Sequence, residues 1–149
     1  VAVRGIIFID GKLLLIESNL GELKLPGGGQ EKGEDDLCTL IREVKEETGF
    51  TVLEESVREF GYLEEIRLSV EKDRIWHQIS RLYLCEVDPR QGECAYSSGE
   101  KKEGFRQVFY TLEDAIQKNE EMLRREGEEN VNMREYRTLL LIREQFPVE

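Results

Sequence analysis

The chain has 149 residues, of which 39% are hydrophobic and 36% charged, so it can bury one core without disulfide support. Its formal net charge of −11 repels phosphate backbones and anionic lipids, which argues against stable nucleic-acid binding and against a role at a membrane surface. An anionic substrate is compatible with this charge if divalent cations bind together with it.

The first 17 residues predict a β-hairpin. Two apolar runs flank Asp10-Gly11, a pair that favours a two-residue turn because both central positions need a positive φ. A polar connection over residues 18–22 leads to a short extended piece at 23–26 and then to three consecutive glycines, 27–29. Glycines let the backbone approach a neighbouring group closely, so a carbonyl in this run is a candidate metal ligand.

Residues 34–48 predict an α-helix. Apolar side chains recur there at spacings of three and four residues and form one face: Leu37, Leu40, Ile41 and Val44. Acidic residues at positions 34–36 load the first turn with the charge that the helix dipole favours, and Gly49 supplies a stop at the other end.

The rest of the chain predicts further strands, one long loop and two more helices. The strands cover residues 57–68, 75–87 and 105–110, with a turn at 71–74; the loop covers 88–104; the helices follow Thr111 and Asn132, the last stopping near Pro147. This order predicts one α/β domain over residues 1–149, with a mixed sheet covered by helices on both faces. Pairing of the long strands across subunits would give a homodimer, which the sequence neither requires nor excludes.

The three cysteines, Cys38, Cys85 and Cys94, are odd in number and lack the spacing of a disulfide framework or a zinc site. No signal peptide opens the sequence, and no apolar run approaches the roughly 20 residues of a membrane span. We therefore expect reduced thiols, a cytoplasmic location and no membrane partner.

The predicted helix also carries a cluster of acidic residues. At about 100° per residue, Glu43, Glu46 and Glu47 project within one sector beside the apolar face. Carboxylates this close raise one another's pKa unless cations neutralise them, and hard oxygen ligands on a rigid helix suit Mg²⁺ or Mn²⁺. Arg42 is placed to pair with a neighbouring carboxylate and to hold it in one rotamer. Acidic runs on helices are usually solvated faces, so these residues alone do not establish a site.

The wider spacing of glycine, acidic and basic residues resembles the Nudix box, G-x5-E-x7-R-E-U-x-E-E-x-G-U, in which U is an apolar residue. Every defined position is filled in this sequence: Gly28, Glu34, Arg42, Glu43, Val44, Glu46, Glu47, Gly49 and Phe50. The preceding Leu25-Pro26-Gly27 is similar to the family as well. A match of this length without a departure is highly specific.

This resemblance implies the Nudix α/β/α sandwich and a divalent-metal-dependent hydrolase that cleaves a pyrophosphate bond in a nucleoside diphosphate linked to a further group. Carried over by position, Glu46 and Glu47 would ligate the metal, and the carbonyl of Gly28 would complete its shell. Glu43 would ligate metal or help to orient or deprotonate the attacking water.

Other residues would support this set, by the same resemblance. Arg42 would orient Glu43, and Glu34 would brace the loop. Some family members add a catalytic carboxylate from a loop late in the sheet, where this chain offers Glu93, Glu100 and Glu103. We choose Glu103 because it lies next to the predicted strand at 105–110, although a solvated acid explains it as well.

Three residues outside the motif are candidates for substrate contacts. Arg4 lies in the first strand, where family members often bind substrate, although an arginine on an edge strand explains it equally well. Trp76 and His77 open a strand and are candidates to stack on a base or hydrogen-bond to it. The shared parity of His77 with Ile75 and Ile79 favours a buried or edge histidine instead.

Marker residues of the family's NADH, ADP-ribose and dinucleoside polyphosphate classes are not evident, so we expect a nucleoside triphosphate, one option being an oxidised or damaged one. An NDP-sugar, ADP-ribose or a dinucleoside polyphosphate stays open as an alternative. Two other classes of function are alternatives to a hydrolase: a Nudix-fold module that senses a nucleotide without turnover, and an acidic domain that buffers metal or binds a protein. The intact acidic positions argue against the first, and the lack of an EF-hand loop pattern argues against the second.

Overall fold

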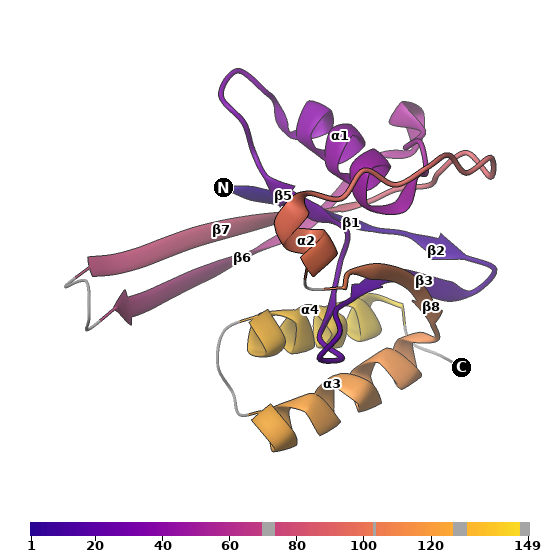
Figure 1. Ribbon diagram of the computed structural model, residues 1–149. Helices are drawn as coiled ribbons and strands as arrows, with labels where there is room; N and C mark the ends of the chain where they lie inside the picture. Colours follow the sequence, from indigo (N-terminus) through magenta and orange to yellow (C-terminus); the bar gives the residue numbers. More distant parts are fainter. Residues whose placement is uncertain (70–73, 103, 127–130, 147–149) are drawn as a thin grey trace.

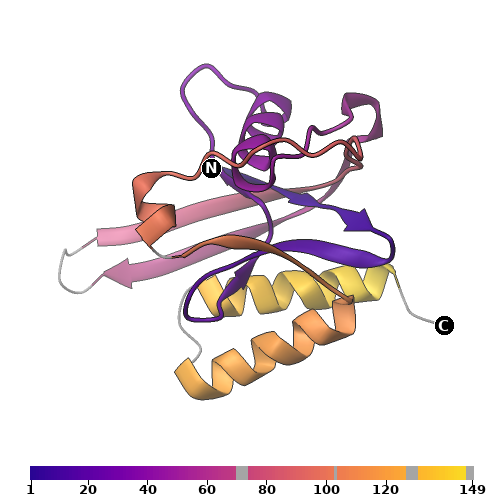
Figure 2. The same ribbon diagram turned by 45° about the vertical axis from the view of Figure 1, so that its right-hand side comes forward.

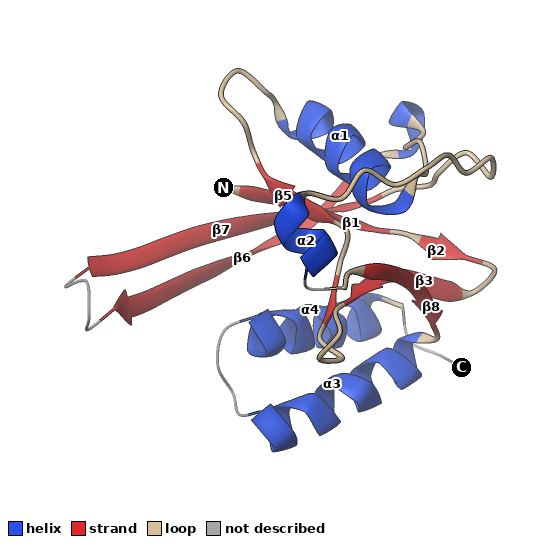
Figure 3. Ribbon diagram, viewed as in Figure 1, coloured by secondary structure: helices blue, strands red, loops and turns tan. Residues whose placement is uncertain are grey.

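The computed structural model describes residues 1–69, 74–102, 104–126 and 131–146. Its strands are β1 (Ala2–Ile6), β2 (Phe8–Ile9), β3 (Lys12–Glu17), β4 (Leu23–Lys24), β5 (Gly27–Gly29), β6 (Arg58–Ser69), β7 (Arg74–Leu84) and β8 (Arg106–Tyr110). Its helices are α1 (Asp36–Thr48), α2 (Ser98–Lys102), α3 (Leu112–Glu126) and α4 (Val131–Gln145), with a 3₁₀ turn at Glu54–Ser56 (Figure 3). None of the described helices is long and apolar enough to cross a membrane.

The described strands form two four-stranded sheets, so the expectation of a single sheet was wrong. The first sheet has the order β5-β1-β7-β6 and is mixed, because β1 and β7 run parallel while its other pairs are antiparallel. The second has the order β2-β3-β4, with β8 pairing β3. The predicted hairpin is therefore confined to β2 and β3, which turn through Asp10 and Gly11, both at positive φ.

Helices cover both faces of the strands, which confirms the predicted α/β/α arrangement (Figure 1). On one face α1 buries Leu40 and Val44 against Val3. On the other face α3 and α4 pack over a second cluster, which includes Ile6. Because side chains alternate along a strand, Arg4 shares the face of Ile6 and points toward the α4 side of the molecule.

Both ends of α1 are fixed by local interactions. The carboxylate of Asp35 caps the first turn by accepting a hydrogen bond of 2.8 Å from the backbone N–H of Cys38. At the other end Gly49 adopts φ 78°, and its N–H donates to the carbonyl of Lys45. The helix begins two residues after the predicted start, because the carboxylate of Glu34 instead accepts a hydrogen bond from the loop N–H of Glu31.

The segment 88–104, which the sequence predicted as a loop, carries the short helix α2. Before this helix, the segment lies along the C-terminal end of α1. Ala95 donates its N–H to the carbonyl of Glu46 at 2.6 Å, and Gly92 donates to Gly49 at 2.7 Å. These contacts satisfy carbonyl groups that a helix end leaves without partners, so the segment holds α2 close to α1.

β6 and β7 extend away from the helices as a long arm (Figures 1 and 2). β1 pairs with β7 only over Ser80–Leu84, so the preceding residues of β7 pair with β6 alone. Two isoleucines on this ribbon are largely exposed, Ile66 at 66% and Ile75 at 71%. The arm is thus a two-stranded ribbon with an uncovered apolar surface.

Candidate functional site

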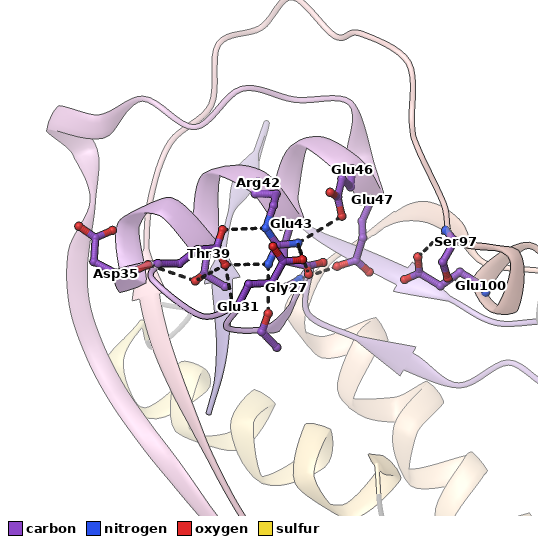
Figure 4. A network of polar contacts seen from close by, with 12 residues as sticks. Gly27, Glu31, Asp35, Thr39, Arg42, Glu43, Glu46, Glu47, Ser97 and Glu100 are labelled. Atoms are coloured by element: carbon purple, nitrogen blue, oxygen red, sulfur yellow. Dashed lines mark hydrogen bonds and ion pairs between the residues drawn. The ribbon is translucent and has the colours of Figure 1, made fainter.

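The three carboxylates of α1 lie beside the glycine strand β5 and share one side of the helix (Figure 4). Their side chains differ in exposure: Glu46 is 42% exposed, Glu43 15% and Glu47 1%. The acidic face that the sequence predicted is therefore not uniformly solvated. It runs from solvent at Glu46 to the interior at Glu47.

Arg42 joins this face to the loop that precedes the helix. Its guanidinium forms a two-pronged ion pair with Glu34, through Nε to Oε2 at 2.8 Å and Nη2 to Oε1 at 2.9 Å. Nη1 donates to Glu43 Oε1 at 2.8 Å and lies 3.5 Å from Glu46 Oε2, and Nη2 also donates to the carbonyl of Gly29. One planar cation therefore fixes the relative positions of three carboxylates and a glycine carbonyl.

Glu34 connects the same network to the loop. It accepts hydrogen bonds from Arg42, from the N–H of Glu31 and from the hydroxyl of Thr39, and these bonds, led by Arg42, lower its pKa to about 2. A carboxylate that stays ionised at neutral pH holds the loop against the helix. This position supports the bracing expected for Glu34.

Glu43 lies directly against Gly28. A Cβ built on Gly28 would be 2.6–2.8 Å from the atoms of the Glu43 carboxyl group, closer than any side chain is tolerated. Burial raises the pKa of Glu43, while the hydrogen bond and charge of Arg42 act in the opposite direction. The absence of a side chain at position 28 is therefore what allows this carboxylate to face β5.

Glu47 is the buried member of the set. Its Oε1 accepts a hydrogen bond of 2.8 Å from the N–H of Gly27, and its Oε2 lies 3.4 Å from Lys24 Nζ. Burial raises the pKa of Glu47 to about 7, although Lys24 and the Gly27 N–H both lower it. Oε2 is buried and accepts no hydrogen bond from any residue that the structure describes, so one oxygen of this carboxylate is available to a further ligand.

The donors at this site suit a hard divalent cation. They are carboxylate and carbonyl oxygens, the ligands that Mg²⁺ and Mn²⁺ take, and one of them is Oε2 of Glu47, which no described donor hydrogen-bonds. Within the described residues, no group of three acidic, histidine or cysteine side chains is arranged so that it could hold a metal ion. Arg42 and Lys24 lie against the carboxylates and supply the positive charge in this arrangement.

Among the described loop carboxylates, Glu100 acts on the site. It lies on α2 and faces the α1 carboxylates (Figure 4), and its charge contributes to the raised pKa of both Glu43 and Glu47. Ser97 fixes it: the Ser97 N–H donates to Glu100 Oε1 at 2.9 Å, and the Glu100 N–H donates to the Ser97 hydroxyl. Glu103, the carboxylate chosen from the sequence, lies outside the described residues. Glu103 was chosen over Glu100, although the Ser-x-x-Glu capping pattern at residues 97–100 could have indicated Glu100.

The substrate-contact candidates lie apart from one another. Arg4 is in β1, between β5 and β7, so the edge-strand explanation is wrong for it. His77 is on the two-stranded part of β7, where its Nε2 lies 2.7 Å from Glu64 Oε1, and its side chain is half exposed. Of the two alternatives for His77, the strand edge is correct and burial is not. The side chain of Trp76 lies outside what the structure describes.

A cavity of about 650 Å³ adjoins Glu47 through Lys24. Basic side chains from four different elements line it: Arg4, Lys24, Lys102 and Arg134. Sequence reasoning missed Lys24 and Arg134. The helical spacing of α4 could have indicated Arg134. This residue and Glu135 lie three to eight positions before the buried residues Thr138, Leu139 and Ile142, on the same face of the helix.

A model of the NUDIX domain matches residues 1–143 of the chain. Similar solved structures include the NUDIX domain of Shewanella oneidensis NrtR complexed with ADP ribose, with a TM-score of 0.65, 15% identity and coverage of 97% of this chain and 86% of that one. An ADP-ribose pyrophosphatase from Streptococcus suis has a TM-score of 0.60 and 19% identity, with coverage of 99% of this chain and 92% of that one. A MutT protein from Bacillus halodurans has a TM-score of 0.56 and 23% identity, with coverage of 78% of this chain and 71% of that one. No curated protein matches the chain at a significant level.

Proposed function

The chain belongs to the NUDIX family and is a Nudix pyrophosphohydrolase, and we propose that its substrate is a nucleoside triphosphate and its cofactor Mg²⁺ or Mn²⁺. One observation carries this proposal: Arg42 ties Glu34, Glu43 and Glu46 into one network, next to a buried Glu47 whose Oε2 receives no hydrogen bond from the described residues. A solvated helix face would not need such fixed carboxylates. The basic cavity beside Glu47 supports an anionic substrate.

Nudix hydrolases generally use divalent metal ions. We assign the ligands here to Glu46, Glu47 and Glu43, with the carbonyl of Gly28. Such an ion, when bound, neutralises the diphosphate and lowers the pKa of the attacking water. The protein's own contribution is to hold these oxygen atoms in place through Arg42 and the N–H of Gly27.

The chain also supplies acceptors for the proton of the attacking water. In the reaction a water oxygen attacks one phosphorus in line, the bond from that phosphorus to the bridging oxygen breaks, and a proton leaves the water. Glu43 is a suitable acceptor, because burial makes its carboxylate more basic than usual. Glu100 is a second acceptor, and we assign to it the role of a loop carboxylate because Ser97 aims it at the site.

The proposal is tested by measuring phosphate and pyrophosphate release with Mg²⁺ over a panel of nucleotides. The panel contains nucleoside triphosphates, oxidised ones included, with NDP-sugars, ADP-ribose and dinucleoside polyphosphates. Glu47→Gln should lower turnover at least about 100-fold while the fold is kept, because the site loses a charge that would hold the metal. Glu55→Gln on the 3₁₀ turn is the matched control, since Glu55 is exposed and acidic, and it should keep full activity.

Each outcome of this panel has a distinct meaning. A preferred triphosphate that the Glu47→Gln variant no longer cleaves supports both the reaction and the substrate. Preference for an NDP-sugar, ADP-ribose or a dinucleoside polyphosphate would overturn the substrate proposal alone. Tight nucleotide binding without turnover across the whole panel would identify a sensing module instead of an enzyme for these nucleotides.

A further inference from the structure

Arg4 is a buried cation that forms no ion pair with the acidic residues that the structure describes. It lies in β1, between two other strands, with 7% of its surface exposed. Its Nε and Nη1 atoms are buried and make no hydrogen bond within the described part of the chain. Burial lowers the pKa of this guanidinium, and Glu135, Glu47 and Glu65 offset the effect only from a distance.

Each of those three acids is already paired with another cation. Arg134 donates from Nη2 to Glu135 Oε1 at 3.1 Å and lies 3.5 Å from Glu65 Oε1 through Nη1. Glu47 has Lys24 at 3.4 Å. An unpaired charge in the interior is costly, so a guanidinium in this position is best explained by a partner that binds from outside the chain.

The environment of Arg4 is a cavity and not a packed core. The cavity of about 650 Å³ falls in the size range of small-molecule sites. Its described lining includes a single acid, Glu22, against four cations. In a chain with a net charge of −11, this concentration of positive charge favours a ligand group that is negatively charged.

We propose that Arg4, with Lys102 and Arg134 beside it, binds a phosphate group of the nucleotide other than the two that flank the cleaved bond. This inference rests on the proposed function, because the α1 carboxylates would fix the position of that bond. Lys24 connects the two regions: its Nζ lies 3.4 Å from Glu47 Oε2 and 4.4 Å from the centroid of the Phe105 ring, which also lines the cavity. The subsite selects substrates with three or more phosphates over those with a neutral sugar.

Binding in EDTA tests the subsite separately from the reaction. The probes are inorganic tripolyphosphate and inorganic pyrophosphate, titrated by calorimetry into wild type, Arg4→Gln and Arg4→Lys, together with a nucleoside triphosphate. Removal of divalent cations leaves the basic cavity as the binding site for the probes. Arg143→Gln is the matched control, because Arg143 is an exposed arginine on α4 outside this cavity.

We expect wild type to bind tripolyphosphate at least 10-fold more tightly than pyrophosphate. Arg4→Gln should weaken tripolyphosphate binding by about 10- to 100-fold, the usual effect of losing a charged hydrogen bond, and Arg4→Lys should restore part of it. Arg143→Gln should change the dissociation constant less than twofold. This pattern in EDTA would stand even if no nucleotide were hydrolysed with Mg²⁺, so the failure of one proposal is separable from the failure of the other.

Three results would overturn the subsite. Equal affinity of wild type for both inorganic probes would show that no third phosphate is recognised, and this comparison requires no variant to fold. Equal losses of tripolyphosphate affinity in Arg4→Gln and Arg143→Gln would show that the effect comes from the change in net charge and not from a contact of Arg4. Loss of binding for the nucleotide alone, with tripolyphosphate unaffected, would mean that Arg4 contacts the base and not a phosphate.

Discussion

Glu47 is the most deeply buried carboxylate of α1, and its neighbours only partly offset the cost of its charge. Its pKa in the folded protein is about 7, against an ordinary value of 4.5. Between these values the folded state binds a proton that the unfolded state has released, so this residue makes stability fall as pH rises from about 4.5 to 7. The full effect is about 3 kcal/mol.

We therefore expect Glu47→Gln to stabilise the metal-free protein at pH 8 relative to wild type, although it removes activity. Gln retains an acceptor for the Gly27 N–H but carries no buried charge. Urea unfolding in EDTA at pH 5 and at pH 8 measures the change. Glu46→Gln, at an exposed position of the same face, is the control, and an equal change of stability with pH in both variants would contradict the assignment to Glu47.

The position of Glu43 depends on the missing side chain at Gly28. Gly28→Ala places a Cβ within 2.8 Å of the Glu43 carboxyl group, so this carboxylate must move. We expect kcat/KM to fall by about 100-fold, the usual consequence of displacing a reacting group by an ångström. Gly29→Ala is the neighbouring control, since a Cβ there meets nothing within 4 Å. Similar losses in both variants would show that the Glu43 contact is not the cause.

At the scale of elements, the C-terminal end of α1 depends on Gly49. Its φ of 78° disfavours any other residue, and a Cβ there would clash with the carbonyl oxygen of Gly92. We expect Gly49→Ala to lower the free energy of unfolding by more than about 1 kcal/mol and to loosen the segment that carries α2. Chemical denaturation measures this, with Gly61→Ala as control, because a Cβ at Gly61 has open space. Equal stability of the two variants would contradict it.

The elements that the sequence predicted well are those with local signals. α1 was predicted from its apolar spacing, its acidic start and Gly49, and the structure confirms a helix there. The two-sheet arrangement was missed because β1 and β2 differ in their partners, β7 and β3, which lie far apart in the sequence. The periodicity of apolar residues in the sequence does not indicate which distant strand each of them pairs with.

The candidate site divides in the same way. Glu43, Glu46 and Glu47 were predicted to share one helix face because helical geometry alone places them there, and the structure shows them on it. The sequence could not predict that Arg134 lies near Arg4, because the two residues are 130 positions apart and line the same cavity only through the packing of α4. α2 was missed because five residues in a polar segment show no helical period.

At the scale of the whole molecule, the β6–β7 arm extends beyond the rest of its sheet. A two-stranded ribbon is marginally stable in water, β6 is the free edge of its sheet, and the register places Tyr62, Ile66 and Ile75 on one face. All three are at least 66% exposed. Antiparallel pairing of two β6 strands about a twofold axis would cover this edge and join identical surfaces.

We therefore expect a homodimer formed through the arms, with a mass by light scattering of twice the 17.4 kDa of one chain. Ile66→Lys with Ile75→Lys should give a monomer, because two charges would enter the shared apolar surface. Phe109→Lys is the control: Phe109 is an exposed apolar residue on β8, outside the arm, and its replacement should leave the dimer intact. A wild-type chain that stays monomeric at about 100 μM would show that the arm instead remains free or binds a different protein.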